Sequence, residues 1–229
     1  MAAVMRATVV VFPGSNAESE LVRTIRDAAN AETSMTWHTD TTLPAGIDLV
    51  ALPGGFSYGD YLRSGALAKA CPIVPAIVAH AARGGYVLGV CNGFQILTEV
   101  GLLPGALTRN QKLRFECRDV HLKVASAGPF TARAGEVWRL PIAHAEGRYQ
   151  ASDEVLNVLD AEGRVGLVYS TADGEVTDEA NPNGSQRSIA GVYGGPRRNV
   201  FGLMPHPERM SEPLHGGTDG RKLFAAVLG

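Results

Sequence analysis

The chain has 229 residues, is 45% hydrophobic and carries a formal net charge of −2. A chain of this size and composition can bury one substantial core, so we expect a single domain over residues 1–229. Because the charge is close to balanced and no long basic run occurs, nucleic acid is not expected as a partner.

The cysteines and the N-terminus indicate the compartment. Cys71, Cys91 and Cys117 lack the short spacings of a zinc site or a redox pair, which suits a reducing environment. The first apolar run is interrupted by Arg6 and ends at Pro13-Gly14, too early for a membrane span. We therefore expect a soluble, cytoplasmic protein with no membrane partner and no metal site.

Strands and helices are expected to alternate in the first half of the chain. The apolar runs at 7–12, 35–38, 47–52 and 85–90 predict strands, and the stretches 17–29, 61–70 and 75–82 predict helices. This order is typical of a parallel sheet covered by helices on both faces. In such open sheets, functional sites lie beyond the carboxyl ends of the strands.

The second half has a different pattern. After a helix that Gly101 is expected to close, residues 118–124 alternate between apolar and polar side chains, as in a strand exposed on one side. Further strands are predicted at 166–170, 188–193 and 200–204. We expect an α/β fold with an open, mostly parallel sheet flanked by helices and an added antiparallel β portion.

The segment around Cys91 is the most informative part of the sequence. Gly89 and Gly93 stand two residues before and after the cysteine, between a predicted strand and a predicted helix. This spacing permits the strained turn of a nucleophile elbow, and the helix N-terminus would favour the thiolate. The alternative is a structural cysteine, since free cysteines are among the most buried residues.

A catalytic thiol needs a base and a later proton donor, and imidazole suits both tasks. His206 follows the strand predicted at 200–204, and Pro207 keeps it extended. Residues two apart in an extended segment point to the same side, so Glu208 could orient the imidazole. The alternative is that His206, Pro207 and Glu208 are simply polar residues at the end of a strand, with no catalytic role. Surface or capping roles are expected for four other histidines, His38, His80, His121 and His215.

Three segments together resemble the class I glutamine amidotransferases, whose triad is Cys, His and Glu in that chain order. They are Gly-Val-Cys-Asn-Gly-Phe-Gln at 89–95, Leu-Pro-Gly-Gly at 52–55 and Met-Pro-His-Pro-Glu at 204–208. The resemblance implies a flavodoxin-like fold of that class and a triad of Cys91, His206 and Glu208.

The resemblance narrows to the family of glutaminase subunits of phosphoribosylformylglycinamidine synthase, in its free-standing form. It rests on the segments 53–63, 143–149 and 181–185 and extends over nearly the whole chain. Ser64, where an alanine is expected, is a minor departure.

The resemblance also implies a mechanism. Cys91 would attack the side-chain carboxamide of glutamine, and the backbone N–H groups of Gly55 and Asn92 would bind the oxyanion. Gln95, one helical turn after Cys91, would border the glutamine pocket. The pocket or a docking surface would be shaped further by His144, Glu146 and Arg148.

Cofactors and partners follow from the same resemblance. The glycine-rich stretch 216–222 lacks the register of a phosphate-binding loop, so this chain is expected to use no cofactor of its own. The family reading implies a large synthetase subunit that uses ATP and Mg²⁺ to amidate formylglycinamide ribonucleotide, and a small third subunit. Because idle turnover wastes glutamine, we expect weak glutaminase activity from the isolated chain.

Two alternatives remain open from the sequence. Hydrolases that resemble γ-glutamyl hydrolases also place a thiol above a parallel sheet, and they would cleave γ-glutamyl peptides rather than free glutamine. An interaction subunit that had lost its chemistry would keep the fold without using Cys91.

Overall fold

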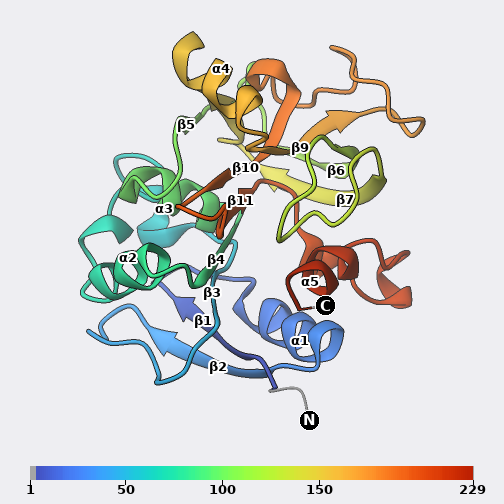
Figure 1. The fold of residues 1–229 in the computed structure, drawn as a ribbon. Helices are drawn as coiled ribbons and strands as arrows, with labels where there is room; N and C mark the ends of the chain where they lie inside the picture. The colour runs from blue at the N-terminus through green and yellow to red at the C-terminus, as the bar shows by residue number, and fades with distance from the viewer. Residues whose placement is uncertain (1–3, 229) are drawn as a thin grey trace.

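The structure is a computed structural model that describes residues 4–228. Within those residues a nine-stranded sheet runs through the molecule in the order β2-β1-β3-β4-β11-β10-β9-β6-β7 (Figure 1). Its parallel strands are β1 (Arg6–Val11), β2 (Glu32–Trp37), β3 (Leu49–Leu52), β4 (Tyr86–Val90) and β11 (Val200–Leu203).

The remaining strands of the large sheet pair antiparallel. They are β6 (Glu116–Val124), β7 (Val137–His144), β9 (Val165–Ser170) and β10 (Ile189–Gly194). A small separate sheet joins β5 (Ala106–Thr108) to β8 (Arg148–Gln150), also antiparallel. The predicted fold class, mostly parallel with an added antiparallel portion, is therefore confirmed.

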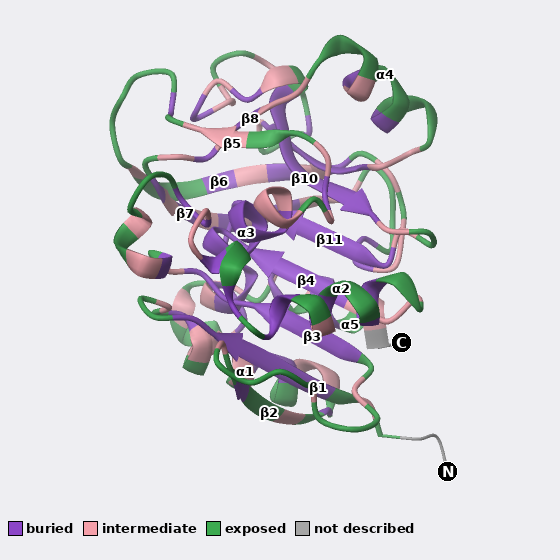
Figure 2. Ribbon diagram, turned by 90° about the vertical axis from the view of Figure 1, so that its left-hand side faces the viewer, coloured by how far each residue is buried: buried purple, intermediate pink, exposed green. Residues whose placement is uncertain are grey.

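Helices cover both faces of the parallel half. Helices α1 (Glu18–Ala29) and α5 (Arg221–Leu228) pack together on one face, and α2 (Val74–Ala82) and α3 (Asn92–Val100) lie on the other (Figure 1). This double cover explains why β3 and β4 are continuous apolar runs, buried almost throughout (Figure 2). Helix α4 (Asp153–Ala161) lies at the far end of the molecule, beside the antiparallel strands. None of the helices in residues 4–228 is long and apolar enough to cross a membrane.

The helix predicted within residues 61–70 is wrong. That stretch contains only a short 3-10 helix at Ala68–Ala70. Within that stretch Leu62 and Gly65 have positive φ angles, +72° and +79°, which an α-helix does not contain. The segment instead packs against α3, where Gly65 lies close to the backbone of Gln95 and Ile96.

The sequence also left several elements unpredicted: β5, β7, β8, α4 and α5. Strand β7 is the most consequential, because it ends at His144. Pro141 interrupts its pattern, and proline is tolerated there because β7 is the edge strand of the sheet. By contrast, the alternation predicted for residues 118–124 is confirmed by β6, in which Val120, Leu122 and Val124 are buried.

Candidate active site

Cys91 occupies a strained turn between β4 and α3. Its backbone angles, φ +51° and ψ −105°, lie outside the regions that non-glycine residues ordinarily adopt. A methyl group at Gly93 would come 2.1 Å from the carbonyl oxygen of Leu52, and one at Gly89 would come 2.7 Å from the Gly93 carbonyl carbon. Both glycines are therefore needed for strand and helix to approach closely. The geometry is that of the predicted elbow.

Gly93→Ala is expected to lower the free energy of unfolding by about 3 kcal/mol, the upper range for overpacking, because the new methyl meets backbone that cannot rotate away. A matched control is Gly101→Ala at the other end of α3, where φ is +83° but the space is open. That variant should lose only about 1 kcal/mol. Urea unfolding of both variants tests the expectation, and equal losses would contradict it.

His206 and Glu208 form a buried pair. Nδ1 of His206 lies 2.6 Å from Oε1 of Glu208, and the two residues are 2% and 0% exposed. His206 has extended backbone angles, and its N–H donates to the carbonyl of Pro141. The two side chains thus point to the same side, as the sequence predicted from their spacing. Nε2 of His206 has no hydrogen-bond partner within residues 4–228.

Charges on either side of His206 change its pKa. Burial alone works to lower the pKa, but the negative charges of Glu208 and of a Cys91 thiolate outweigh it and raise the pKa above the ordinary value. The imidazolium is therefore favoured between two anions. Such a group is suited to donate a proton from Nε2 to a leaving group near Cys91.

The loop after β3 lies against Cys91 and His206. A methyl group at Gly54 would come 2.7 Å from Cε1 of His206 and 3.6 Å from Cβ of Cys91, so only glycine fits between them. The loop is fixed by backbone bonds, including one of 2.8 Å from Phe56 N to Gly14 O. In the described part of the chain, neither Gly55 nor Asn92 donates its N–H to a protein acceptor. Both N–H groups are available to a ligand.

The side chain of Asn92 joins this loop to α3. Its Oδ1 accepts a hydrogen bond of 3.1 Å from Ser57 N, and its Nδ2 donates to Oε1 of Gln95 at 2.9 Å. Gln95 in turn donates from Nε2 to the carbonyl of Glu146 at 2.6 Å. Asn92 was predicted only for its backbone N–H, and its amide adds a positioning contact that the sequence did not indicate.

The end of β7 lies beside Cys91, and the segment that follows it contacts the loop around Ser64. The carbonyl oxygen of Ala143 lies 3.9 Å from Sγ of Cys91. Glu146 accepts a hydrogen bond of 2.8 Å from Oγ of Ser64, the residue at which the sequence departs from its family pattern. Nearby Asp60 has a raised pKa, chiefly through burial and further through the charge of Glu146. The structure therefore brings Glu146 and Gln95 to the rim of the elbow.

Arg148 is placed differently from the other three residues predicted to bind substrate. Its Nε donates to the carbonyl of Gly184 at 3.0 Å, which anchors β8 to the turn at residues 181–185. His144, by contrast, is 3% exposed and ends β7 beside the elbow. Burial, followed by the positive charge of His206, lowers the pKa of His144 to about 4. His144 is therefore neutral at physiological pH.

Sequence reasoning missed two buried residues beside the site. Asn110 contacts His144, with its Oδ1 3.1 Å from Nδ1 of the imidazole. Tyr169 is fully buried, and its pKa is raised by burial and further by the charge of Cys91. Tyr169 accepts a hydrogen bond of 3.3 Å from Asn183. Asn183 stood in a segment with family resemblance, but no signal in the sequence indicated Asn110.

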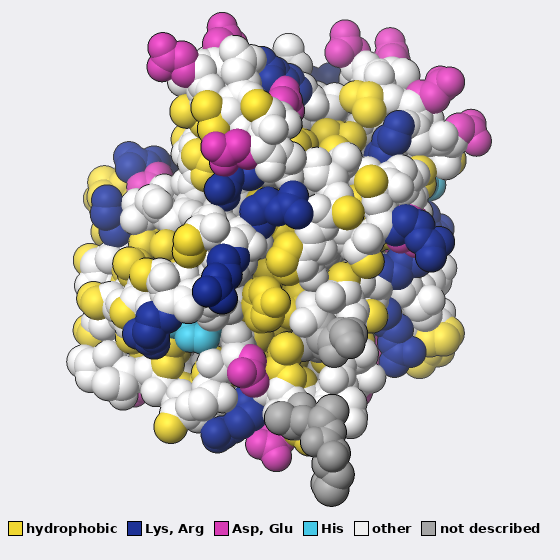
Figure 3. All heavy atoms as spheres, in the orientation of Figure 1, with side chains coloured by type: hydrophobic (Ala, Val, Ile, Leu, Met, Phe, Trp, Pro, Cys, Tyr) yellow, Lys and Arg dark blue, Asp and Glu magenta, His cyan; other side chains and the backbone are white. Residues whose placement is uncertain are grey.

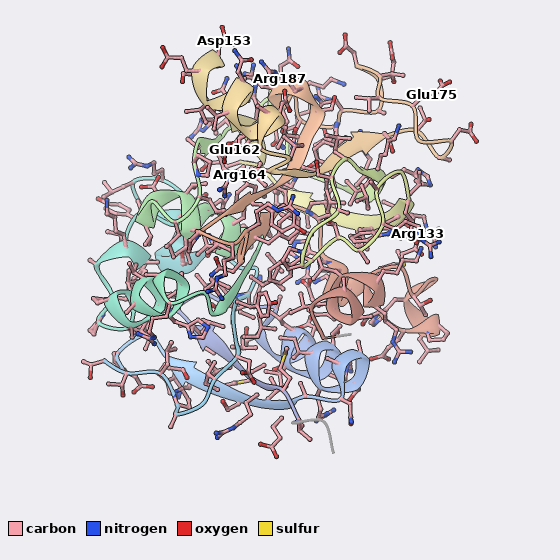
Figure 4. The ribbon with its side chains drawn as sticks, in the orientation of Figure 1. Arg133, Asp153, Glu162, Arg164, Glu175 and Arg187 are labelled. Carbon is pink, nitrogen blue, oxygen red and sulfur yellow. The ribbon has the colours of Figure 1, made fainter. Side chains whose placement is uncertain are left out.

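A surface hollow of about 670 Å³ lies elsewhere, between α3, α4 and the end of β10. The hollow lies at the end of β10 that contains Gly194, and Gly194 pairs with Val200 at the start of β11. His206 follows the other end of β11, so the hollow and His206 lie at opposite ends of that strand. Acidic side chains gather nearby over α4 (Figure 3), and Arg164 on its rim pairs with Glu162 (Figure 4). None of the site residues predicted from the sequence lines this hollow, so the candidate site is defined by Cys91.

Comparison with known proteins agrees with this geometry. Residues 4–219 match the family model of the CobB/CobQ-like glutamine amidotransferase domain. The PurQ subunit of phosphoribosylformylglycinamidine synthase from Bradyrhizobium diazoefficiens is 53% identical over 97% of both chains. The corresponding subunit from Ruegeria pomeroyi is 54% identical over 98% of both chains. The structure of PurLQS from Thermotoga maritima superposes with a TM-score of 0.86 and 44% identity, covering 99% of this chain and 98% of that one.

The chain therefore belongs to the class of glutamine amidotransferases. Its cysteine elbow and buried His-Glu pair are consistent with that class. Within that class, it belongs to the family of PurQ subunits of phosphoribosylformylglycinamidine synthase. The resemblance noted from the sequence is confirmed.

Proposed function

We propose that this chain is the glutaminase subunit of a phosphoribosylformylglycinamidine synthase. It hydrolyses glutamine to glutamate and ammonia and delivers the ammonia to a synthetase subunit. The observation that carries the proposal is the strained Cys91 at the elbow beside the buried His206–Glu208 pair, in a chain 53% identical to a PurQ subunit. The same family membership disfavours a γ-glutamyl hydrolase, and the intact triad disfavours an idle interaction subunit.

The reaction begins at Cys91. Its thiolate attacks the side-chain carboxamide of glutamine, and a bond forms between Sγ and the carbonyl carbon. The negative charge that develops on oxygen is stabilised by the N–H groups of Gly55 and Asn92, which have no acceptor among residues 4–228. One such donor contributes about 3–4 kcal/mol to transition-state stabilisation. The positions of Gly54 and the Asn92 side chain hold the two donors in place.

His206 completes both halves of the reaction. As imidazolium it gives a proton to the departing nitrogen, so that ammonia leaves and a γ-glutamyl thioester remains on Cys91. As neutral imidazole it then takes a proton from the water that hydrolyses the thioester. Glu208 keeps the ring oriented and favours its charged form. Gln95, His144 and Glu146 border the glutamine pocket in this proposal, and Arg148 supports it from the turn at 181–185.

The acceptor chemistry is assigned to partners. Relatives of this chain are named as synthase subunits, and the Thermotoga maritima structure is of PurLQS. We assign to a large synthetase subunit the conversion of formylglycinamide ribonucleotide to formylglycinamidine ribonucleotide in purine biosynthesis. That subunit would use ATP and Mg²⁺, and a small third subunit would complete the complex. This chain is assigned no cofactor and a cytoplasmic location.

The test is reconstitution with the synthetase subunits of the same organism. Glutamine-dependent product formation should require this chain, whereas formation from ammonium salt should not. The isolated chain should release ammonia from glutamine slowly, and addition of the synthetase should raise that rate. Glutamine-dependent synthesis without this chain would overturn the proposal, as would cleavage of γ-glutamyl peptides without hydrolysis of free glutamine. Full glutaminase activity of the isolated chain would contradict the expectation that the synthetase activates it.

A further inference from the structure

The protonation of His144 is fixed by its neighbour Asn110. The amide Nδ2 of Asn110 donates to the carbonyls of Arg114 and His144, both at 2.8 Å. This leaves Oδ1 to accept, and it does so from Gly147 N at 3.0 Å and from the His144 ring at 3.1 Å. Because an amide oxygen can only accept, Nδ1 of His144 must carry the hydrogen.

Nε2 of His144 therefore presents a lone pair. The atom is buried, and it has no hydrogen-bond partner among residues 4–228. Buried acceptors in folded proteins are normally paired, so an orphan at the edge of a site is a place where a ligand is expected to donate. The ring also stays uncharged at physiological pH, because burial and the charge of His206 lower its pKa to about 4.

The backbone that leads into His144 lies beside Cys91. The carbonyl of Ala143, in the peptide bond that leads into His144, lies 3.9 Å from Sγ of Cys91. The positive charge of His206 also contributes to the lowered pKa of His144, after burial. Glutamine offers two kinds of N–H donor, the carboxamide nitrogen and the α-ammonium group. The carboxamide nitrogen is the one that must lie between Cys91 and the proton donor His206.

We propose that Nε2 of His144 accepts a hydrogen bond from the carboxamide nitrogen of glutamine and holds that nitrogen as it leaves. This inference rests on the proposed glutaminase function. The C–N bond breaks as the C–S bond to Cys91 forms, and the proton on Nε2 of His206 moves to the nitrogen. His144 gains and loses no proton. A neutral imidazole can thus hold ammonia without converting it to ammonium, which keeps the product nucleophilic for the next reaction.

The test compares two substrates that differ only in the leaving group: glutamine, and the γ-methyl ester of glutamate, whose leaving group has no N–H to donate. Glutamate formation is measured in the synthase complex. His144→Phe keeps a ring of similar size but removes the acceptor. It should lower kcat for glutamine by roughly 10- to 100-fold and change kcat for the ester by less than about threefold. His144→Gln, which restores an acceptor oxygen, should retain more of the glutamine activity than the Phe variant.

Two controls separate this role from a structural one. His121→Phe makes the same change on strand β6, away from the elbow, and should leave both substrates unaffected. Thermal unfolding of the His144 variants checks the fold, and the Gln variant answers the question if the Phe variant does not fold. Equal losses with the two substrates, or no loss with glutamine, would overturn the inference. Failure of the unmodified complex to hydrolyse either substrate would instead refute the proposed function.

Discussion

Cys91→Ala is expected to reduce glutamate formation from glutamine by roughly 10⁴- to 10⁶-fold, the range seen when a nucleophile is removed from a triad. The loss should be this large because neither other cysteine can substitute. Cys71 is 5% exposed, with its Sγ 3.2 Å from the hydroxyl of Tyr58, and burial raises the pKa of its thiol. Cys117 is an exposed residue of β6.

Two measurements distinguish lost chemistry from a lost fold. The Cys91→Ala complex should still form product from ammonium salt, since that reaction needs only the synthetase. Cys117→Ala is the matched control and should keep glutamine-dependent activity. If Cys91→Ala retained glutamine-dependent activity, the chain would have to work without a thioester, and the elbow would be structural.

Glu208→Gln is expected to lower kcat for glutamine by roughly 10²- to 10⁴-fold, because loss of the carboxylate removes the charge that favours the His206 imidazolium. The pKa of His206 should fall, since Glu208 is a cause of its elevation. The proton donor would then be lost at lower pH, so the basic limb of the pH–rate profile should move toward acid.

The pH–rate profile distinguishes a lowered pKa of His206 from unfolding as the cause of the lost activity. A variant that merely unfolded would lose activity at every pH without displacing the limb. Glu212→Gln provides the control, because Glu212 pairs at 2.9 Å with Arg23 on the surface and has no contact role in the triad. A Glu208→Gln enzyme with unchanged kcat and an unchanged pH profile would contradict the assigned role.

Local sequence determined much of the fold and the placement of Cys91, His206 and Glu208. The β-branched run of β1 requires only local pattern and was predicted correctly, as was the strand-helix alternation that follows it, apart from the helix within 61–70. The elbow followed from the spacing of Gly89 and Gly93 around the cysteine. The contact of His206 with Glu208 followed from a separation of two residues in an extended segment. Each of these features is decided within a few residues of chain.

The features that were missed depend on contacts between distant segments. The helix predicted within 61–70 is interrupted by positive φ angles at Leu62 and Gly65, and Gly65 packs against the backbone of α3. Strand β7 was obscured by Pro141 and exists because it pairs with β6 along its length. Asn110 reaches His144 across a separation of 34 residues, so no local pattern could have revealed it.

The most direct test of the central claim is covalent labelling by an electrophilic diazoketone analogue of glutamine. The chain is treated alone and with the synthetase, with excess glutamine as competitor, and is examined by intact mass and peptide mapping. The structure predicts one adduct, on Cys91, that glutamine prevents and Cys91→Ala abolishes. Absence of an adduct in both conditions, or labelling of Cys117 that glutamine does not block, would contradict the account.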